Sequence, residues 1–149
     1  MTAIARLTLL LIVATCGSNS ARAQQSELFG PYELHYSVVN TTFLAPEVAA
    51  TYGIVRGEQR AILTLAVREH LADGGNQART MQLQGRTWDL IQKSEALDFL
   101  EIREGQSVYY VAEFKFINED WRFFEVDFRP DGARETYTFK LKHQLYIEQ

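Results

Sequence analysis

The sequence predicts an all-β protein, an immunoglobulin-like antiparallel β-sandwich of about seven strands with one short helix inserted after the first strand. Two observations lead to this prediction. Apolar and polar residues alternate with a period of two along most of the chain, and clusters of Gly, Pro, Asn and Asp separate the alternating runs. A length of 149 residues, of which 46% are hydrophobic, fits one domain with one core.

The first 23 residues have the pattern of a secretory signal peptide. Arg6 precedes an apolar run at 7–14, and Ala21-Arg22-Ala23 offers small residues on both sides of the position before cleavage. We expect cleavage near Ala23, which leaves residues 24–149 as a single β-sandwich domain that is periplasmic or secreted. The apolar run is too short for a permanent membrane span, so the mature chain is expected to have no transmembrane segment.

Cys16 offers an alternative processing site, and with it a different location for the protein. Val13-Ala14-Thr15-Cys16 is an imperfect version of a bacterial lipoprotein processing site, because Thr15 stands where a smaller residue normally precedes the acylated Cys. If this site is used, the protein is lipid-anchored through Cys16. Cleavage after Ala23 instead removes the only Cys, and with it any disulfide, thiol nucleophile or Cys-ligated metal.

The strands are predicted in order from the alternation. They cover 32–38, 61–68, 80–90, 96–102, 108–116, 121–128 and 137–147. The run at 61–68 is apolar on both faces, which is typical of a central strand. Tyr109 and Tyr110 are neighbours on one strand, so one ring is expected in the core and the other on the outside.

One segment interrupts the strands. Pro46 suits a first helical position, Glu47 favours a helix N-terminus, and Gly53 suits the position just past the helix end. The pattern predicts a helix over Pro46–Tyr52. Because it follows the first strand, we expect it to cover a sheet edge or the open end of the sandwich.

Composition and motifs limit the function. Without Arg6 and Arg22, thirteen basic residues face nineteen acidic ones, which argues against nucleic-acid binding. No catalytic, cofactor or metal motif is present, so we expect neither enzyme activity nor a cofactor. The alternative is a small periplasmic hydrolase or metal-dependent enzyme, in which Glu33 and His35 would act with Tyr52 or Arg56.

Several segments resemble a known family. Residues 30–37, 40–49 and 52–56 are similar to the opening of DUF4426 proteins, exported proteobacterial proteins of unknown function, and 109–114 and 138–146 are similar to later parts. The resemblance implies a small β-sandwich in a Gram-negative envelope. It implies no activity, ligand or catalytic residue.

These observations favour a non-enzymatic binding or accessory module whose partner is another envelope protein. Loops on a rigid sandwich commonly carry recognition, so the irregular segment 40–56 is the predicted contact surface. Its candidate contact residues are Asn40, Thr42, Glu47, Tyr52 and Arg56. A second interpretation is that Phe43, Leu44, Val48 and Tyr52 only cap the core. The sequence predicts no oligomeric state.

Overall fold

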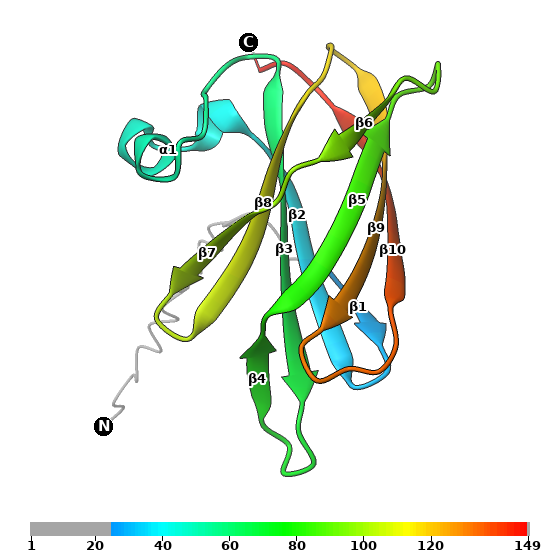
Figure 1. Cartoon of the computed structure of the whole chain (residues 1–149). Coiled ribbons are helices and arrows are strands. Elements are labelled where there is room, and N and C mark those ends of the chain that lie inside the picture. The colour runs from blue at the N-terminus through cyan, green and yellow to red at the C-terminus, as the bar shows by residue number, and fades with distance from the viewer. Residues whose placement is uncertain (1–24, 149) are drawn as a thin grey trace, which may run out of the picture.

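The computed structural model describes residues 25–148. The predicted signal peptide, its cleavage near Ala23 and Cys16 lie outside the described residues. Within them the chain forms ten strands, one 3-10 helix and one α-helix (Figure 1). In chain order they are β1 Gln25–Phe29, β2 Tyr32–Asn40, η1 Thr41–Phe43, α1 Pro46–Tyr52, β3 Arg60–His70, β4 Asn76–Arg79, β5 Met81–Trp88, β6 Ser94–Leu97, β7 Leu100–Glu104, β8 Ser107–Lys115, β9 Asp120–Pro130 and β10 Tyr137–Leu145.

The strands form two antiparallel sheets. The first has the order β1-β2-β3-β8-β7, and β4 pairs with the last four residues of β3. The second has the order β10-β9-β5-β6. β3 is the central strand of the first sheet, as its two apolar faces predict. The predicted immunoglobulin-like antiparallel sandwich is confirmed as a β-sandwich, with ten strands in place of about seven.

The core lies between the sheets and follows the predicted alternation. Leu65 on β3 and Phe114 on β8 come from the first sheet, and Phe124, Val126 and Phe128 on β9 come from the second. All five are at most 4% exposed. The rings of Phe114 and Phe124 meet edge to face, with centroids 5.1 Å apart. This core joins the two sheets along their length.

The prediction of one strand over 96–102 is wrong. β6 pairs with β5 in the second sheet, whereas β7 pairs with β8 in the first. Leu97 and Ile102 are both buried, but they are an odd number of residues apart and belong to different apolar clusters. A single strand would place them on opposite faces, so the chain changes sheet at Asp98-Phe99.

Two strands are missing from the prediction. β1 and β4 are five and four residues long, and most of their residues are exposed. Such short polar strands show little alternation because neither face is deeply buried. A turn at 72–74 separates β3 from β4, which starts at Asn76.

The helix has its predicted bounds and covers part of the first sheet. Gly53 adopts the left-handed conformation, with φ 69°, and its N–H faces the carbonyls of Ala49 and Ala50. The segment covers the outer face of the first sheet over β3, β8 and the edge strand β7. Its apolar side chains pack on a small second cluster; Leu44, Tyr52 and Ile54 contact the group formed by Ile62, Ile102 and Val111. No helix within residues 25–148 is long and apolar enough to cross a membrane.

Candidate functional site at the loop end

Four segments meet at one end of the sandwich. They are the helical segment 41–59, the β5–β6 loop 89–93, the β8–β9 loop 116–119 and the C-terminal segment 146–148 (Figure 1). We call this region the loop end. Asn40 Nδ2 donates a hydrogen bond to the carbonyl of Tyr146 at 2.8 Å, and the N–H of Ile147 donates to Asn118 Oδ1 at 2.8 Å. These bonds tie the C-terminal segment to the loops beside it.

The other four predicted contact residues lie on the helical segment. Arg56 Nη2 donates to the carbonyl of Thr42 at 3.1 Å, and the hydroxyl of Tyr52 donates to the carboxylate of Glu104 on β7. This hydrogen bond raises the pKa of the Tyr52 phenol. Glu47 is exposed at the first turn of α1. Tyr52 therefore holds the segment on the sheet, Arg56 ties two parts of the segment together, and the side chains of Glu47 and Arg56 are both exposed.

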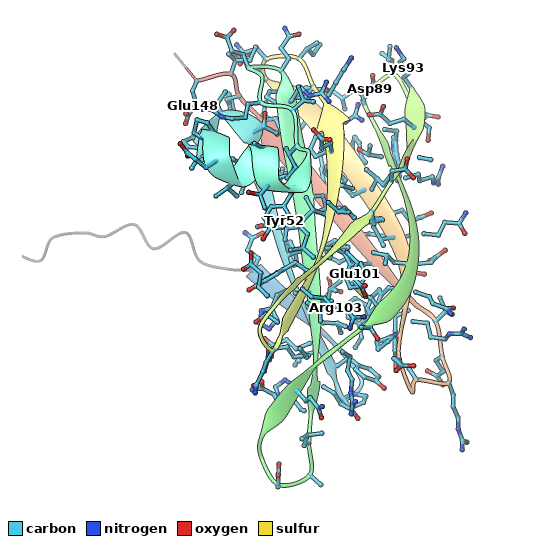
Figure 2. The ribbon with its side chains drawn as sticks, turned by 60° about the vertical axis from the view of Figure 1, so that its left-hand side comes forward. Tyr52, Asp89, Lys93, Glu101, Arg103 and Glu148 are labelled. Carbon is cyan, nitrogen blue, oxygen red and sulfur yellow. The ribbon has the colours of Figure 1, made fainter. Side chains whose placement is uncertain are left out.

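Beside this segment the loop end contains a cleft of about 350 Å³. It lies between the β5–β6 hairpin and the connection from β8 to β9. Figure 2 shows Asp89 and Lys93 at the same end of the molecule as α1. We call it the Arg122 cleft; its lining residues are Gln59, Asp89, Lys93, Ser94, Glu95, Lys115, Phe116, Ile117, Asp120 and Arg122.

Arg122 is the buried charge of this cleft. Along β9 it alternates in phase with Phe124 and Val126, so its side chain lies on the core side and is 5% exposed. Its Nη2 donates to Glu95 Oε1 at 2.8 Å, and its guanidinium lies 5.7 Å from the ring centroid of Phe114. Its Nε is buried without a hydrogen-bond partner among the described residues. The guanidinium is thus only partly satisfied by the protein.

The acidic side chains of the cleft are mostly engaged. Asp89 Oδ1 accepts hydrogen bonds from the N–H groups of Ile91 at 3.1 Å and Lys93 at 2.9 Å. These bonds fix the tip of the β5–β6 hairpin in the way of an Asx turn. Glu95 neutralises Arg122. The charges that remain on the walls are Lys93 and Lys115, opposed by Asp120.

Exposed apolar side chains lie on the two loops beside the cleft. Leu90 and Ile91 at the hairpin tip are 63% and 84% exposed, and Ile117 is 66% exposed. The two loops also carry the two non-glycine residues with positive φ in the described chain, Gln92 and Glu119, both at 62°. Such backbone strain is concentrated at binding and catalytic sites. The loop end thus combines strain, apolar exposure and a buried charge.

A second polar cluster lies on the outer face of the first sheet. Glu33 Oε1 accepts a hydrogen bond from Ser26 Oγ at 2.7 Å, and Glu33 Oε2 lies 2.9 Å from His70 Nε2. His35 Nε2 is 3.7 Å from Glu33 Oε1. The hydrogen bond from Ser26 and the one with His70 hold the pKa of Glu33 below its usual value, although partial burial opposes them.

Tyr52 and Arg56, the other two residues of the predicted catalytic alternative, lie outside this cluster. Arg56 binds the carbonyl of Thr42, just past the far end of β2, whereas the hydroxyl of Tyr52 binds Glu104 on β7, which is separated from β2 by β3 and β8 in the first sheet. The rise of β2 puts about 20 Å between Glu33 and the end of the strand near which Arg56 is held. Among residues 25–148 no three His, Cys, Asp or Glu side chains are arranged to hold a metal ion.

Reasoning from the sequence singled out the helical segment and missed the cleft. Its signal was present in the alternation of β9, since Arg122 has the phase of the core residues Phe124, Val126 and Phe128. An Arg that alternates in step with core residues near the end of a strand indicates a charged side chain where the core opens to solvent. His70, which completes the Glu33 cluster, carried no comparable signal because it comes from a different strand.

Comparison with known proteins identifies structures with a similar fold and the family of the chain. A crystal structure of a DUF4426 family protein from Pseudomonas aeruginosa PAO1 superposes with a TM-score of 0.73 at 24% identity, covering 87% of this chain and 99% of that one. FetP of uropathogenic Escherichia coli strain F11, expressed in the periplasm of E. coli, is similar with a TM-score of 0.60 at 8% identity, covering 85% and 95%. A copper-bound variant of FetP gives 0.56 at 9% identity, covering 85% and 92%.

No curated protein sequence matches the chain. The family model for the domain of unknown function DUF4426 matches residues 26–148, which is almost the whole domain. The match covers both sheets and all four segments of the loop end. The chain therefore belongs to the DUF4426 family.

Proposed function

We propose that this DUF4426 protein is an exported, non-enzymatic binding or accessory module of the cell envelope, and that it contacts another envelope protein through the loop end. The leader-like pattern at 1–23 supports export, as does the similarity of its fold to FetP, a protein expressed in the periplasm. The observation that carries the proposal is the Arg122 cleft with its exposed rim of Leu90, Ile91 and Ile117. Exposed apolar side chains grouped in one place on a surface are typical of a contact surface.

Cross-linking inside intact cells of the organism tests the proposal. A photoreactive amino acid replaces Ile91 at the hairpin tip, and a matched variant carries it at Asp73, an exposed residue in the β3–β4 turn at the opposite end (Figure 1). We expect one dominant envelope protein to cross-link from position 91 and not from position 73. Equal, diffuse labelling from both positions would show that the loop end is not the contact surface.

The alternative, a metal-dependent enzyme or hydrolase, has one observation in its favour. His70 joins Glu33 and His35, so two imidazoles approach one carboxylate. Replacing His35 by Ala separates the two functions, because an enzyme of this kind loses activity without unfolding, whereas partner binding at the loop end is unchanged. The matched control is His143→Ala, since His143 lies on a different strand and sheet.

Location is tested separately from function. Periplasmic fractionation of the mature protein is expected, with an N-terminus at Gln24. Cys16→Ser leaves this processing intact if cleavage follows Ala23. Accumulation of an unprocessed precursor would instead identify a lipoprotein anchored through Cys16, which is compatible with the same contact surface.

A further inference from the structure

We propose that β10 is a second interaction surface, on which an extended acidic segment of a partner protein pairs as an added strand of the second sheet. This surface lies outside the loop loosely defined by segments 41–59, 89–93 and 116–119, and the proposal does not depend on the contact at the loop end. β10 is the last strand of its sheet and has β9 as its single neighbour (Figure 1). Three features carry the proposal: a long edge with free backbone groups, a partly uncovered core-side row, and an excess of positive charge.

The free side of β10 presents a row of unpaired backbone groups. All nine residues of the strand pair with β9 in continuous register, without a bulge or a proline. In a strand with one neighbour, the N–H and C=O groups of every second residue face away from that neighbour. Within residues 25–148 no backbone group outside β9 is bonded to this strand. These groups can therefore form the hydrogen bonds of a further strand.

The other strands with one neighbour are much shorter. β1, β4, β6 and β7 contain five, four, four and five residues, and a short edge is one of the ways in which proteins prevent edge-to-edge pairing. β10 has nine residues, so it spans about 30 Å. An edge of this length is normally covered or interrupted. A strand supplied by a partner would cover it.

The core-side row of β10 is only partly covered. Phe139 and Leu145 are 1% and 2% exposed, whereas Tyr137, Leu141 and His143 in the same row are partly exposed. The core is thus open to solvent along this side of the sandwich. An added strand would continue the row and bury more of these three side chains, so every second side chain of the partner segment is expected to be apolar.

The outward row of β10 determines the charge of the other partner side chains. It contains no carboxylate; its members are Thr138, Lys140, Lys142 and Gln144. Lys140 is 71% exposed, although its Nζ lies 3.4 Å from Glu125 Oε2 on β9. The Nζ of Lys142 lies 4.4 Å from the ring centroid of Trp121 and forms no ion pair with a carboxylate of the described chain. Both lysines therefore remain available to carboxylates on an added strand.

The surroundings do not cancel this charge. By the alternation of β5, β9 and β10, the outer face of the second sheet carries four cations and two carboxylates, namely Arg86, Arg129, Lys140 and Lys142 with Glu125 and Asp127. β1, the edge of the first sheet on the same side, adds one carboxylate, Glu27. An excess of positive charge remains. A segment with acidic side chains at every second residue therefore fits β10, and a basic one does not.

A second copy of this chain fits the same edge poorly. In a symmetric antiparallel pair of β10 strands, registers centred on residues 140, 141 or 142 place a lysine of one copy directly opposite a lysine of the other. Like charges in directly opposite positions are destabilising. Lys140 and Lys142 thus disfavour self-pairing of the edge, and the same two charges attract an acidic strand.

Peptide binding to the purified domain, residues 24–149, tests the proposal. The probe is a pool of nine-residue peptides with blocked termini, matched in length to β10, in which Glu alternates with Val, Leu or Phe; a second pool carries Lys in place of each Glu. We expect binding from the acidic pool and none from the basic pool at an ionic strength of about 0.15 M, where charges more than about 8 Å apart are largely screened. The domain has thirteen basic and nineteen acidic residues, so its net charge alone would favour the basic pool.

Amide hydrogen exchange locates the bound peptide. With the tightest acidic peptide bound, every second amide of residues 137–145 is expected to exchange at least about tenfold more slowly, because its N–H then donates to the peptide. The amides of β7, which is the far edge of the first sheet, are the control and should not change.

Charge-reversal variants test the role of the two lysines. Lys140→Glu and Lys142→Glu are each expected to weaken the acidic peptide about two- to tenfold, since an exposed ion pair becomes a repulsion. The double variant is expected to bind the basic pool instead. Lys115→Glu is the matched control, because it makes the same change at an exposed strand position of the first sheet. An unfolding curve of each variant shows that binding is measured on folded protein.

The outcomes are distinct. Binding of the acidic pool, slower exchange at 137–145 and a reversed preference in the double variant support the proposal. Equal binding of the two pools, slower exchange confined to other segments, or no binding of the acidic pool overturns it. Light scattering that shows a dimer in wild type and a monomer in an edge variant would assign the edge to a second copy, and this also overturns it. Cross-linking from position 91 is a separate result, so the contact at the loop end and the edge of β10 can fail independently.

Discussion

Tyr110 is the side chain through which the two sheets share a buried hydrogen bond. Its hydroxyl accepts from the N–H of Met81, the first residue of β5, at 2.9 Å and donates to Glu101 Oε1 on β7 at 2.7 Å. Burial, followed by the hydrogen bond to Glu101, raises the pKa of Tyr110 to about 12. The phenol is therefore protonated at neutral pH, and it acts as donor and acceptor at once where the chain passes from β4 to β5.

Tyr110→Phe removes both hydrogen bonds and keeps the ring. Tyr110 is 4% exposed and Met81 is 7% exposed, so the freed N–H of Met81 is left buried without an acceptor. An unsatisfied buried donor costs about 1–3 kcal/mol. The ring still fills its space, so no cavity is added. For a domain of this size we expect the melting temperature to fall by about 4–12 °C.

Tyr109→Phe is the matched control. Tyr109 is the neighbouring residue on β8, faces the outer cluster and is only partly buried, so its loss is expected to change stability by less than about 0.5 kcal/mol. Urea unfolding of both variants checks the prediction, with the slope m unchanged in each. Equal midpoints for Tyr110→Phe and Tyr109→Phe would refute the reasoning, because the bond between the sheets would then contribute nothing.

Three further predictions follow from the packing and the titrating groups. Gly85→Ala is expected to destabilise by about 1–3 kcal/mol in urea unfolding, because its Cβ would lie 2.9 Å from Val126 Cγ2; an unchanged midpoint would contradict this. Burial lowers the pKa of His143, so the unfolded chain takes up its proton first and stability falls as pH drops below about 6.5; melting temperatures between pH 7.5 and 5 should fall less steeply in His143→Gln. The pKa of Glu33 is lowered chiefly by Ser26, so its contribution to stability is present above about pH 4.5 and is lost as the pH falls through the lowered pKa; Ser26→Ala should raise that pKa in an NMR titration.

The fold was predictable because most strands bury one face deeply. The residues Phe124, Val126 and Phe128 alternate with polar neighbours, and this period of two is visible in one sequence. The same principle fails for β1 and β4, in which no such row exists. It fails also at 96–102, since Leu97 and Ile102 are each apolar but belong to different sheets, and nothing local marks the change.

The position of the candidate site could be predicted from the sequence, but its chemistry could not. In an antiparallel succession of strands, the connections that follow every second strand emerge at the same end. The predicted strands at 32–38, 80–90 and 108–116 run in one direction, so the segments that follow them meet, as the structure shows for 41–59, 89–93 and 116–119.

The pairing of Arg122 with Glu95 required the structure. Arg122 alternates along β9 with the core residues, so its side chain points toward the core. Because β9 begins at the loop end, the alternation alone predicts a buried cation there. Its partner depends on the register of β6 on β5, in which Glu95 pairs with Thr87 and so lies on the core side. Four-residue strands do not fix register in a sequence, because shifting β6 by one residue would turn Glu95 to the outside. That shift would leave Arg122 buried and unpaired and would turn the core residue Leu97 outward, so both the cost of an unpaired buried charge and the burial of Leu97 favour the observed register.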